Sequence, residues 1–458
     1  MTPPSAIVDR SKLPALLPVP RFDFPAVTKS TLANGVRVWT ARHTVVPMTG
    51  MLLLVRRGAS SDPAGLEGLA AITADMLDEG VGSLSAIDVH ERLARIGAQL
   101  DSDIGSDAML IGLTSLSRFS GQAVAFLADL VVRPALREDD FLRVRQQRLH
   151  RLIQLRDMPG ATAERAFAKL LYGSSPYGHT PLGNEASLGA MTIDDVRAFH
   201  QRAIRPEDTT LVAVGDGDHE TMVSLAEEAF GAWRATGAIV EPPPQVLPQA
   251  ARLNVVPRPG AAQSELRIGH VSVARSTPDY HALVAANMVL GGQYVSRINM
   301  NLRAEKGITY GARTAFEFRR SPGPFVLSVS VDRAATALAI SESIREISDV
   351  RGARPVSADE LAIGVAALTR GYAKNFETFD QVARAIAQLS LFDLPESFYS
   401  DFVPRIEALT PDDVSRAASR YLDPARLTTL VVGDVDATSQ DFGRLNLGAA
   451  NVLTADSI

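Results

Sequence analysis

Apolar and polar residues follow two different periods along the first half of the chain. Within residues 31–42, apolar and polar side chains alternate on either side of Asn34-Gly35, a dipeptide typical of a hairpin turn. Residues 65–79 instead carry apolar side chains three and four positions apart, the spacing of a helix buried along one face. The same reasoning predicts strands within 51–57, 98–117 and 209–214, and helices over 87–96, 119–132, 138–156, 162–171, from 192 onward and over 218–233.

A segment of the first half recurs in the second half at a constant offset. The chain reads MTIDDVRAFHQRAIRPEDTTLVAVGDGD from Met191 and LTPDDVSRAASRYLDPARLTTLVVGDVD from Leu409. The offset is 409 − 191 = 218 residues, without a gap. This period is far longer than that of a solenoid repeat, so it indicates two homologous domains. Because each domain mixes hairpin-forming strands with clustered helices, an α+β fold is favoured over a doubly wound sheet.

Proline-rich stretches separate these domains from their surroundings. Pro242-Pro243-Pro244 and Pro248 indicate a linker, and the N-terminal residues are also rich in proline. We therefore expect an extended N-terminal arm over 1–26, an N-terminal domain over 27–235, a linker over 236–250, a C-terminal domain over 251–445 and a tail over 446–458.

Composition narrows the class of protein. The chain has 458 residues, of which 46% are hydrophobic, enough for sizeable cores. Its formal net charge of −6 argues against a nucleic-acid partner. The absence of cysteine excludes disulfides, thiolate zinc sites and a cysteine nucleophile. The apolar runs are too short for a membrane span, and the first residues do not read as a signal peptide. We therefore expect a cytoplasmic protein, with the periplasm as the alternative.

Residues 296–311, reading SRINMNLRAEKGITYG, are the first candidate for chemistry. Their apolar spacing predicts a helix that ends at Gly307, a residue suited to a left-handed stop. Arg303 then lies near the end of this helix, and Tyr310 lies just beyond it among β-type residues. The two side chains could face one cleft. The alternative is a solvated arginine and a tyrosine whose ring lies in the core.

Familiar catalytic patterns are missing from the sequence. A zinc hydrolase needs two or three His or carboxylate ligands and a base, yet none of the eight histidines has another within five residues. No G-x-S-x-G string and no glycine-rich phosphate loop occurs. Asp75, Asp78 and Glu79 form an acidic end on the helix predicted over 65–79, and we expect this end to be solvated.

Several strings together resemble the pitrilysin and insulinase-type peptidases, the inverted zincins with an H-x-x-E-H helix. They are LANGVRVW followed by RRGASSDPAGLEGLA, DMLDEG, YGSSPYGHTPLGNEASLGAMTIDDVRAFH, and LGG followed by SRINMNLRAEKGITYG. The resemblance extends over residues 27–436. It implies a processing-peptidase-like fold of two duplicated α+β domains that form half of a clamshell.

The chain departs from this family at the zinc motif. Family members read GLAHxxEHM where this chain reads GLAAITADM. The resemblance therefore places the two metal histidines on Ala71 and Asp75, the general base on Ala74, and the third ligand near His150-Arg151. Alanine offers neither a ligand atom nor a base, and an arginine such as Arg151 would repel a dication. We expect this chain to bind no metal.

The resemblance also assigns roles to Arg303 and Tyr310. In the family these two residues bind the peptide backbone and stabilise the tetrahedral intermediate across the cleft from the zinc. We therefore expect a subunit that is not an enzyme alone and that pairs with an H-x-x-E-H sibling around an unfolded peptide, with zinc on the sibling. The alternative is a purely structural subunit that resembles the core subunits of respiratory bc-type complexes.

Overall fold

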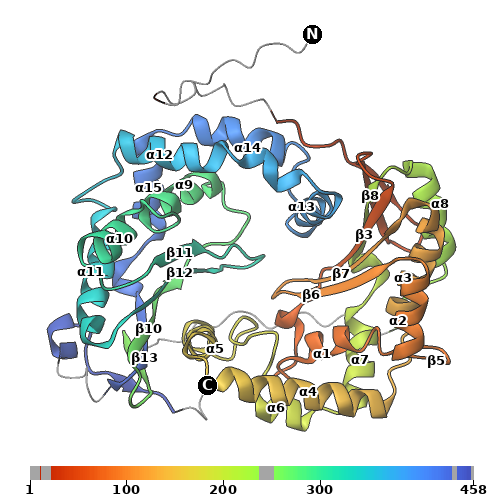
Figure 1. Cartoon of the computed structure of the whole chain (residues 1–458), viewed down its shortest axis with the longest axis horizontal. Helices are drawn as coiled ribbons and strands as arrows, with labels where there is room; N and C mark the ends of the chain where they lie inside the picture. Colours follow the sequence, from red (N-terminus) through yellow and green to blue (C-terminus); the bar gives the residue numbers. More distant parts are fainter. Residues whose placement is uncertain (1–10, 12–21, 237–251, 436–440, 455–458) are drawn as a thin grey trace.

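The computed structural model describes residue 11 and residues 22–236, 252–435 and 441–454. The predicted arm, linker and tail therefore lie partly outside the described residues. The first sheet has the order β1-β2-β8-β3-β7-β6 and the second the order β11-β12-β10-β13-β9-β14 (Figure 1). A two-stranded sheet, β4-β5, completes the set among these residues.

The strands of the first sheet are β1 (Thr28–Thr31), β2 (Arg37–Arg42), β3 (Met48–Val55), β6 (Gln99–Ile104), β7 (Met109–Leu116) and β8 (Thr209–Gly215). Those of the second are β9 (Leu253–Pro257), β10 (Gln263–Val271), β11 (Ala312–Phe316), β12 (Pro324–Asp332), β13 (Thr428–Gly433) and β14 (Asn451–Val452). The small sheet consists of β4 (Gly80–Val81) and β5 (Leu84–Ser85).

Helices of the first half are α1 (Leu69–Asp75), α2 (Ala86–Arg95), α3 (Ser120–Val132), α4 (Glu138–Arg156), α5 (Pro159–Tyr172), α6 (Glu185–Ala190), α7 (Ile193–Ala203) and α8 (His219–Phe230). Those of the second half are α9 (Tyr280–Leu290), α10 (Arg297–Asn299), α11 (Thr336–Asp349), α12 (Ala358–Thr369), α13 (Phe379–Leu391), α14 (Phe398–Glu407) and α15 (Pro411–Tyr421).

The two halves share one topology, as the 218-residue repeat predicts. Strands β2-β8-β3-β7-β6 and β9-β13-β10-β12-β11 occupy the same places and pair in the same directions. Thr192 and Asp195 form a capping box at the start of α7, and Thr410 and Asp413 form its counterpart on α15. The prediction of two duplicated α+β domains is confirmed.

The edge strands distinguish the two sheets. The hairpin predicted around Asn34-Gly35 is confirmed, with β1 antiparallel to β2 and Thr31 opposite Arg37. In the second sheet the equivalent edge is β14, which runs parallel to β9. Because β14 lies within residues 446–458, the part of the predicted tail that contains it is a strand of the second sheet.

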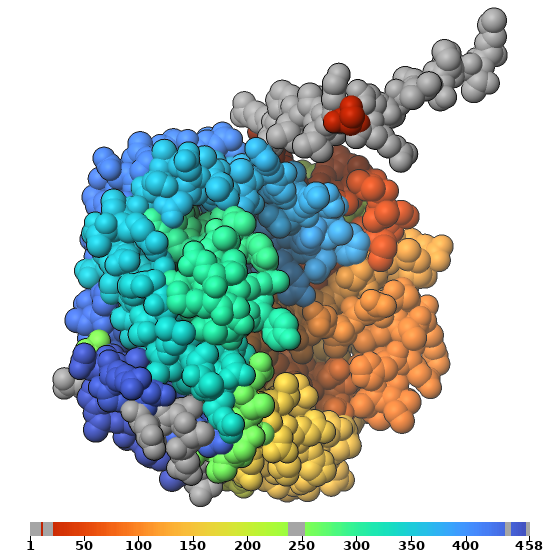
Figure 2. Space-filling model, turned by 60° about the vertical axis from the view of Figure 1, so that its left-hand side comes forward, coloured from red at the N-terminus to blue at the C-terminus, as the bar shows by residue number. Residues whose placement is uncertain are grey.

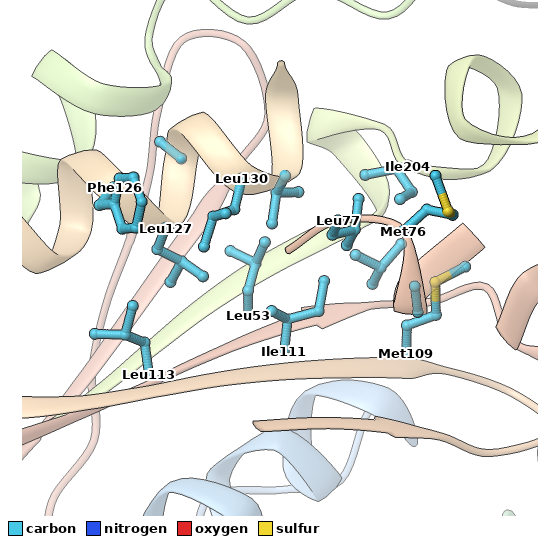
Figure 3. Close-up of a cluster of buried hydrophobic side chains, with 14 of the residues drawn as sticks. Leu53, Met76, Leu77, Met109, Ile111, Leu113, Phe126, Leu127, Leu130 and Ile204 are labelled. Carbon is cyan, nitrogen blue, oxygen red and sulfur yellow. The ribbon is translucent and has the colours of Figure 1, made fainter. Parts of the chain in front are cut away.

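The core of the first half lies between its sheet and the helices on one face. Figure 3 shows Leu53 and Ile111 from β3 and β7 directed toward Phe126 and Leu127 of α3. All four side chains are almost fully buried, so this contact fixes α3 on the sheet. No helix within the described part of the chain is long and apolar enough to cross a membrane.

Each half covers the second face of the other half's sheet with one helix. Helix α13 of the second half packs on β3 and β8, where Ile386 joins the cluster of Leu54 and Val212. Helix α5 of the first half packs on β10 and β13, where Phe167 joins the cluster of Leu430. An offset of 218 carries residues 159–172 onto 377–390, so α5 and α13 are counterparts in the repeat. The two halves therefore exchange equivalent helices.

The described end of the N-terminal arm also reaches the second half. The ring of Phe22 stacks on Phe376 with centroids 4.8 Å apart, and the buried Phe24 packs against Tyr399. The backbone N–H of Phe24 donates to Ser400 Oγ at 3.0 Å. This contact is a further link between the halves, in addition to the exchanged helices.

Candidate functional site

The positions that the resemblance assigns to the metal and the base lie on α1. Ala71 and Ala74 are each 3% exposed, and every residue from Leu69 to Ala74 is buried. The helix is shorter than predicted, because Gly68 has a φ of +97° at its start and the chain leaves the helix after Asp75. Methyl groups at these two positions contribute to packing and provide neither a metal ligand nor a proton acceptor.

The start of α1 is fixed by a buried carboxylate. Asp62 accepts hydrogen bonds from the backbone N–H groups of Gly68 and Ala70, at 2.7 and 2.6 Å. His179 Nε2 lies 3.1 Å from Asp62 Oδ2. Burial raises the pKa of Asp62, and the contacts with His179 and the two N–H groups offset part of that rise. This arrangement positions α1 and leaves no free ligand at its start.

At the other end of α1, an arginine contacts Asp75, one of the positions that the resemblance assigns to a metal ligand. Arg148 Nε of α4 donates to Asp75 Oδ2 at 2.7 Å, and its side chain is largely buried. Glu79 forms an ion pair with Arg143 of the same helix. We expected the acidic residues around the end of α1 to be solvated. Two of them, Asp75 and Glu79, instead pair with arginines of α4.

The resemblance places the third metal position near His150-Arg151, and the residue of α4 that contacts Asp75 is Arg148. Arg151 lies one turn further along α4 and is exposed. A signal for Arg148 was present in the sequence, because it lies four residues from both Val144 and Leu152, which face the core. Among the described residues, no three His, Asp or Glu side chains are grouped in a way that would hold a metal ion.

Arg303 lies in a turn of unusual helical geometry that follows α10. Residues Met300–Glu305 form a π-helical turn, in which the N–H of Lys306 donates to the carbonyl of Asn301, five residues earlier, at 3.1 Å. Such turns are rare and occur often at functional sites. Gly307 then ends the helix with a φ of +66°, as predicted. The next strand begins only at Ala312, so the β-type residues Ile308, Thr309 and Tyr310 lie outside any strand.

A buried asparagine closes the segment that carries Arg303 and Tyr310. Asn299 donates through Nδ2 to the carbonyls of Gln293 and Ala312, at 3.0 and 2.8 Å. Its Oδ1 accepts from the N–H of Ala312 at 2.8 Å. Thr309 Oγ1 adds a hydrogen bond of 2.7 Å to the carbonyl of Ser330 on β12. The backbone around Tyr310 is therefore tied at both ends.

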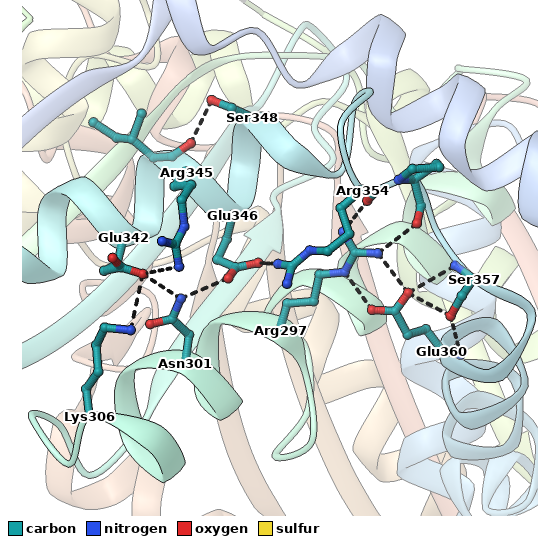
Figure 4. A network of polar contacts seen from close by, with 12 residues as sticks. Arg297, Asn301, Lys306, Glu342, Arg345, Glu346, Ser348, Arg354, Ser357 and Glu360 are labelled. Atoms are coloured by element: carbon teal, nitrogen blue, oxygen red, sulfur yellow. Dashed lines mark hydrogen bonds and ion pairs between the residues drawn. The ribbon is translucent and has the colours of Figure 1, made fainter.

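One network of charged and polar groups attaches this segment to the neighbouring helices, as Figure 4 shows. Arg297 makes a bidentate contact with Glu360 of α12, at 2.6 and 2.7 Å. Burial alone would raise the pKa of Glu360, but hydrogen bonds from Arg297 and Ser357 outweigh it and lower the pKa to about 2. Asn301 donates to Glu342 and Glu346 of α11, at 2.7 and 2.9 Å.

The side chains of Arg303 and Tyr310 themselves point to solvent. Tyr310 is 89% exposed, so the alternative in which its ring lies in the core is wrong. The Arg303 guanidinium carbon lies 4.5 Å from the ring centroid of Tyr294, which is 60% exposed. Val295 and Met300 of the same segment are also exposed. We call these five residues the Arg-Tyr patch; the segment that carries them lies on the face seen in Figure 2.

The structure does not bring the Arg-Tyr patch together with the metal positions. Helix α10, which leads into the patch, and helix α1 lie on opposite sides of Figure 1, in different halves of the molecule. The segment that carries Arg303 and Tyr310 and the positions Ala71 and Asp75 therefore belong to different halves of the chain.

Residues 190–368 match the family described as the peptidase M16 inactive domain. This region includes the Arg-Tyr patch. An uncharacterized zinc protease of Mycobacterium leprae is 25% identical over 329 residues, covering 71% of this chain and 72% of the relative. One from Streptomyces coelicolor is 22% identical and covers 89% of both chains.

Solved structures show the same fold. A peptidase M16 inactive domain from Pseudomonas fluorescens superposes with a TM-score of 0.83 at 23% identity, covering 89% of this chain and 98% of the other. A protease from Helicobacter pylori gives 0.80 at 19% identity, covering 89% and 99%. The resemblance of this chain to the pitrilysin-like M16 peptidases, in a form whose sequence contains no H-x-x-E-H string, is therefore confirmed.

Proposed function

We propose that this protein is the non-catalytic, substrate-binding subunit of a heteromeric zinc metallopeptidase. Its role is to supply Arg303 and Tyr310 to the active site of a sibling chain that carries H-x-x-E-H. The observation that carries this proposal is the Arg-Tyr patch, in which a firmly tied backbone presents a guanidinium and a phenol to solvent.

The metal positions support the first part of the proposal. Buried methyl groups at Ala71 and Ala74 leave α1 without a ligand or a base, and Arg148 is the cationic partner of Asp75. Peptide hydrolysis needs an activated water and a group that accepts its proton. In the proposed complex these come from the partner, where a bound zinc ion would activate the water.

The Arg-Tyr patch supports the second part. A planar guanidinium with five N–H donors and a phenolic O–H suit an oxygen that gains negative charge as a peptide carbonyl is attacked. Such donors are effective only when their positions are set before the reaction. The ties from Asn299 and Thr309 to the surrounding backbone provide this for the segment, while exposure leaves both side chains accessible to a second chain.

The test is reconstitution with a zinc-bearing sibling, sought first in the neighbouring reading frame. Each purified chain is assayed alone and in the mixture against an unfolded peptide. We expect cleavage by the mixture, and loss of most of that cleavage when Arg303→Ala is used. If the mixture assembles and cleaves equally well with Arg303→Ala and with Tyr310→Phe, the subunit is structural and the proposal fails.

A further inference from the structure

A second feature of the N-terminal half is unrelated to the Arg-Tyr patch. Where the chain leaves α8, a cavity of about 430 Å³ lies between the end of α3, helix α7 and residues 232–236. Its charged lining residues among the described part of the chain are Arg133, Arg197 and Arg234, and it includes no carboxylate. Three elements that are distant in sequence thus bring three guanidinium groups to one concavity.

The three arginines are only partly neutralised by their neighbours. Arg133 pairs with Asp129 and Arg197 with Asp194, and each of these aspartates lies three or four residues before its arginine and outside the lining. Arg234 instead donates to two neutral groups, the carbonyls of Gly231 and Trp233, at 2.5 and 2.8 Å. Three arginines and two aspartates give these five side chains a net charge of +1, and only the arginines belong to the cavity lining.

The neutral lining residues add fixed polar groups. His200 Nε2 lies 2.7 Å from the carbonyl of Val131, a contact that holds the ring at the cavity wall. Burial lowers the pKa of His200, so the ring is neutral near pH 7 and adds no positive charge of its own. The amide of Gln201 also lines the cavity and can donate to an oxygen.

We propose that this cavity binds a compact, multiply charged phosphate anion such as pyrophosphate. Guanidinium groups pair with phosphate oxygens through two parallel N–H bonds, and each of the three arginines retains N–H donors beyond those used in the contacts described above. The volume lies within the range of small-molecule sites in proteins. A phosphate anion would also relieve the repulsion among three like charges around one concavity.

The second half provides a matched control. Arg416 lies on α15, the repeat counterpart of α7, and pairs with Asp413 three residues earlier, as Arg197 pairs with Asp194. Arg416 also lines a cavity, of about 340 Å³, but that lining includes the carboxylates of Asp279 and Asp413. That lining also includes Arg405 and Arg420, so Arg416→Gln removes a similar exposed arginine from a cavity whose own wall carries carboxylates that would repel an anion.

The experiment measures pyrophosphate binding to the full chain by calorimetric titration and by the shift of the melting temperature, with sodium chloride at matched ionic strength. We expect saturable binding that Arg197→Gln and Arg234→Gln each weaken about 10- to 100-fold, as expected for the loss of a charge-assisted hydrogen bond. Arg416→Gln should change the affinity less than twofold. Circular dichroism establishes that each variant is folded.

Three results would overturn the proposal. The first is a shift of the melting temperature no larger with pyrophosphate than with chloride. The second is binding by Arg197→Gln and Arg234→Gln that equals that of the unmodified chain. The third is equal weakening by Arg416→Gln, which would indicate attraction by the overall charge of the surface.

Discussion

Arg148 Nε lies 2.7 Å from Asp75 Oδ2, so a guanidinium group of α4 is the cationic partner of the carboxylate that ends α1. This contact predicts a difference between two arginines of one helix. Arg148→Met keeps an apolar stem but leaves the half-buried carboxylate without its partner, which should lower the free energy of unfolding by about 1–3 kcal/mol. The exposed Arg151→Met should change it by less than about 0.5 kcal/mol. Urea unfolding of both variants checks this, and equal effects would contradict it.

The composition of α1 predicts that the purified chain alone holds no stoichiometric zinc and cleaves no peptide. Ala71 and Ala74 have no ligand atoms, and Asp75 is already paired. Elemental analysis after exposure to zinc, followed by a peptide assay with and without a chelator, tests the prediction. One tightly held zinc per chain together with chelator-sensitive cleavage would refute it.

In a reconstituted mixture with a zinc-bearing sibling, Arg303→Ala should lower kcat about 10²–10³-fold, the usual effect of losing one donor to a developing oxyanion. Tyr310→Phe keeps the ring and removes only the hydroxyl group. Arg303→Lys should restore little, because it lacks the planar fork. Since both side chains are exposed, none of these variants should change the melting temperature of the isolated chain appreciably. A KM effect without a kcat effect would assign the residues to ground-state binding.

The Arg297–Glu360 pair predicts a specific pH dependence of stability. The pKa of Glu360 is lowered to about 2 in the folded protein, from an unfolded value near 4.5. A lowered pKa stabilises the fold above the unfolded pKa, and this contribution disappears as the pH falls toward the folded pKa. Glu360→Gln should therefore be less stable than the unmodified chain at pH 7, and the gap should narrow between about pH 5 and pH 2.

The neighbouring residue provides the control for that experiment. Asp359 lies in the same first turn of α12 and is exposed, so Asp359→Asn should give a much smaller stability difference at pH 7. The measurement is the free energy of unfolding in urea at a series of pH values. A gap for Glu360→Gln that is constant across this range would show that Arg297 does not set the titration.

The exchanged helices predict that the two halves lose their structure together. Ile386 of α13 is fully buried on the sheet of the first half, so Ile386→Ala should cost about 2–5 kcal/mol. Hydrogen exchange should show that the loss of protection extends to β3 and β8, although these strands lie more than 170 residues away. Protection lost only within the second half would contradict this prediction.

The sequence predicted the bounds of a helix correctly where residues at its own ends determine where it starts and stops. Helix α4 has the bounds predicted for it, because acidic residues occupy its first turn and Met158-Pro159 follows its end. Helix α1 is shorter than its apolar spacing suggested, because Gly65 and Gly68 both take positive φ values that the period of the pattern does not reveal.

The packing of elements from different halves depended on contacts between residues that are distant in the sequence, which the local pattern does not encode. The sequence predicted a helix at α5 but could not indicate that it would cover β10 and β13 of the other half. Similarly, the short β14 joins β9 from the far end of the chain, and two residues carry too little pattern to predict a strand. For the site, the sequence singled out Arg303 and Tyr310 and the resemblance assigned their roles, whereas the exposure of both side chains and the hydrogen bonds of Asn299 required the structure.

Because the halves exchange α5 and α13, they should stay associated even when the chain between them is cut. Each sheet would lose the cover of one face if the halves separated, so their association does not depend on the peptide bonds between residues 236 and 252. A single proteolytic cut there should leave one particle of unchanged mass in native gels, and two bands only under denaturing conditions. The duplicated halves thus behave as an intertwined dimer whose subunits happen to share one backbone.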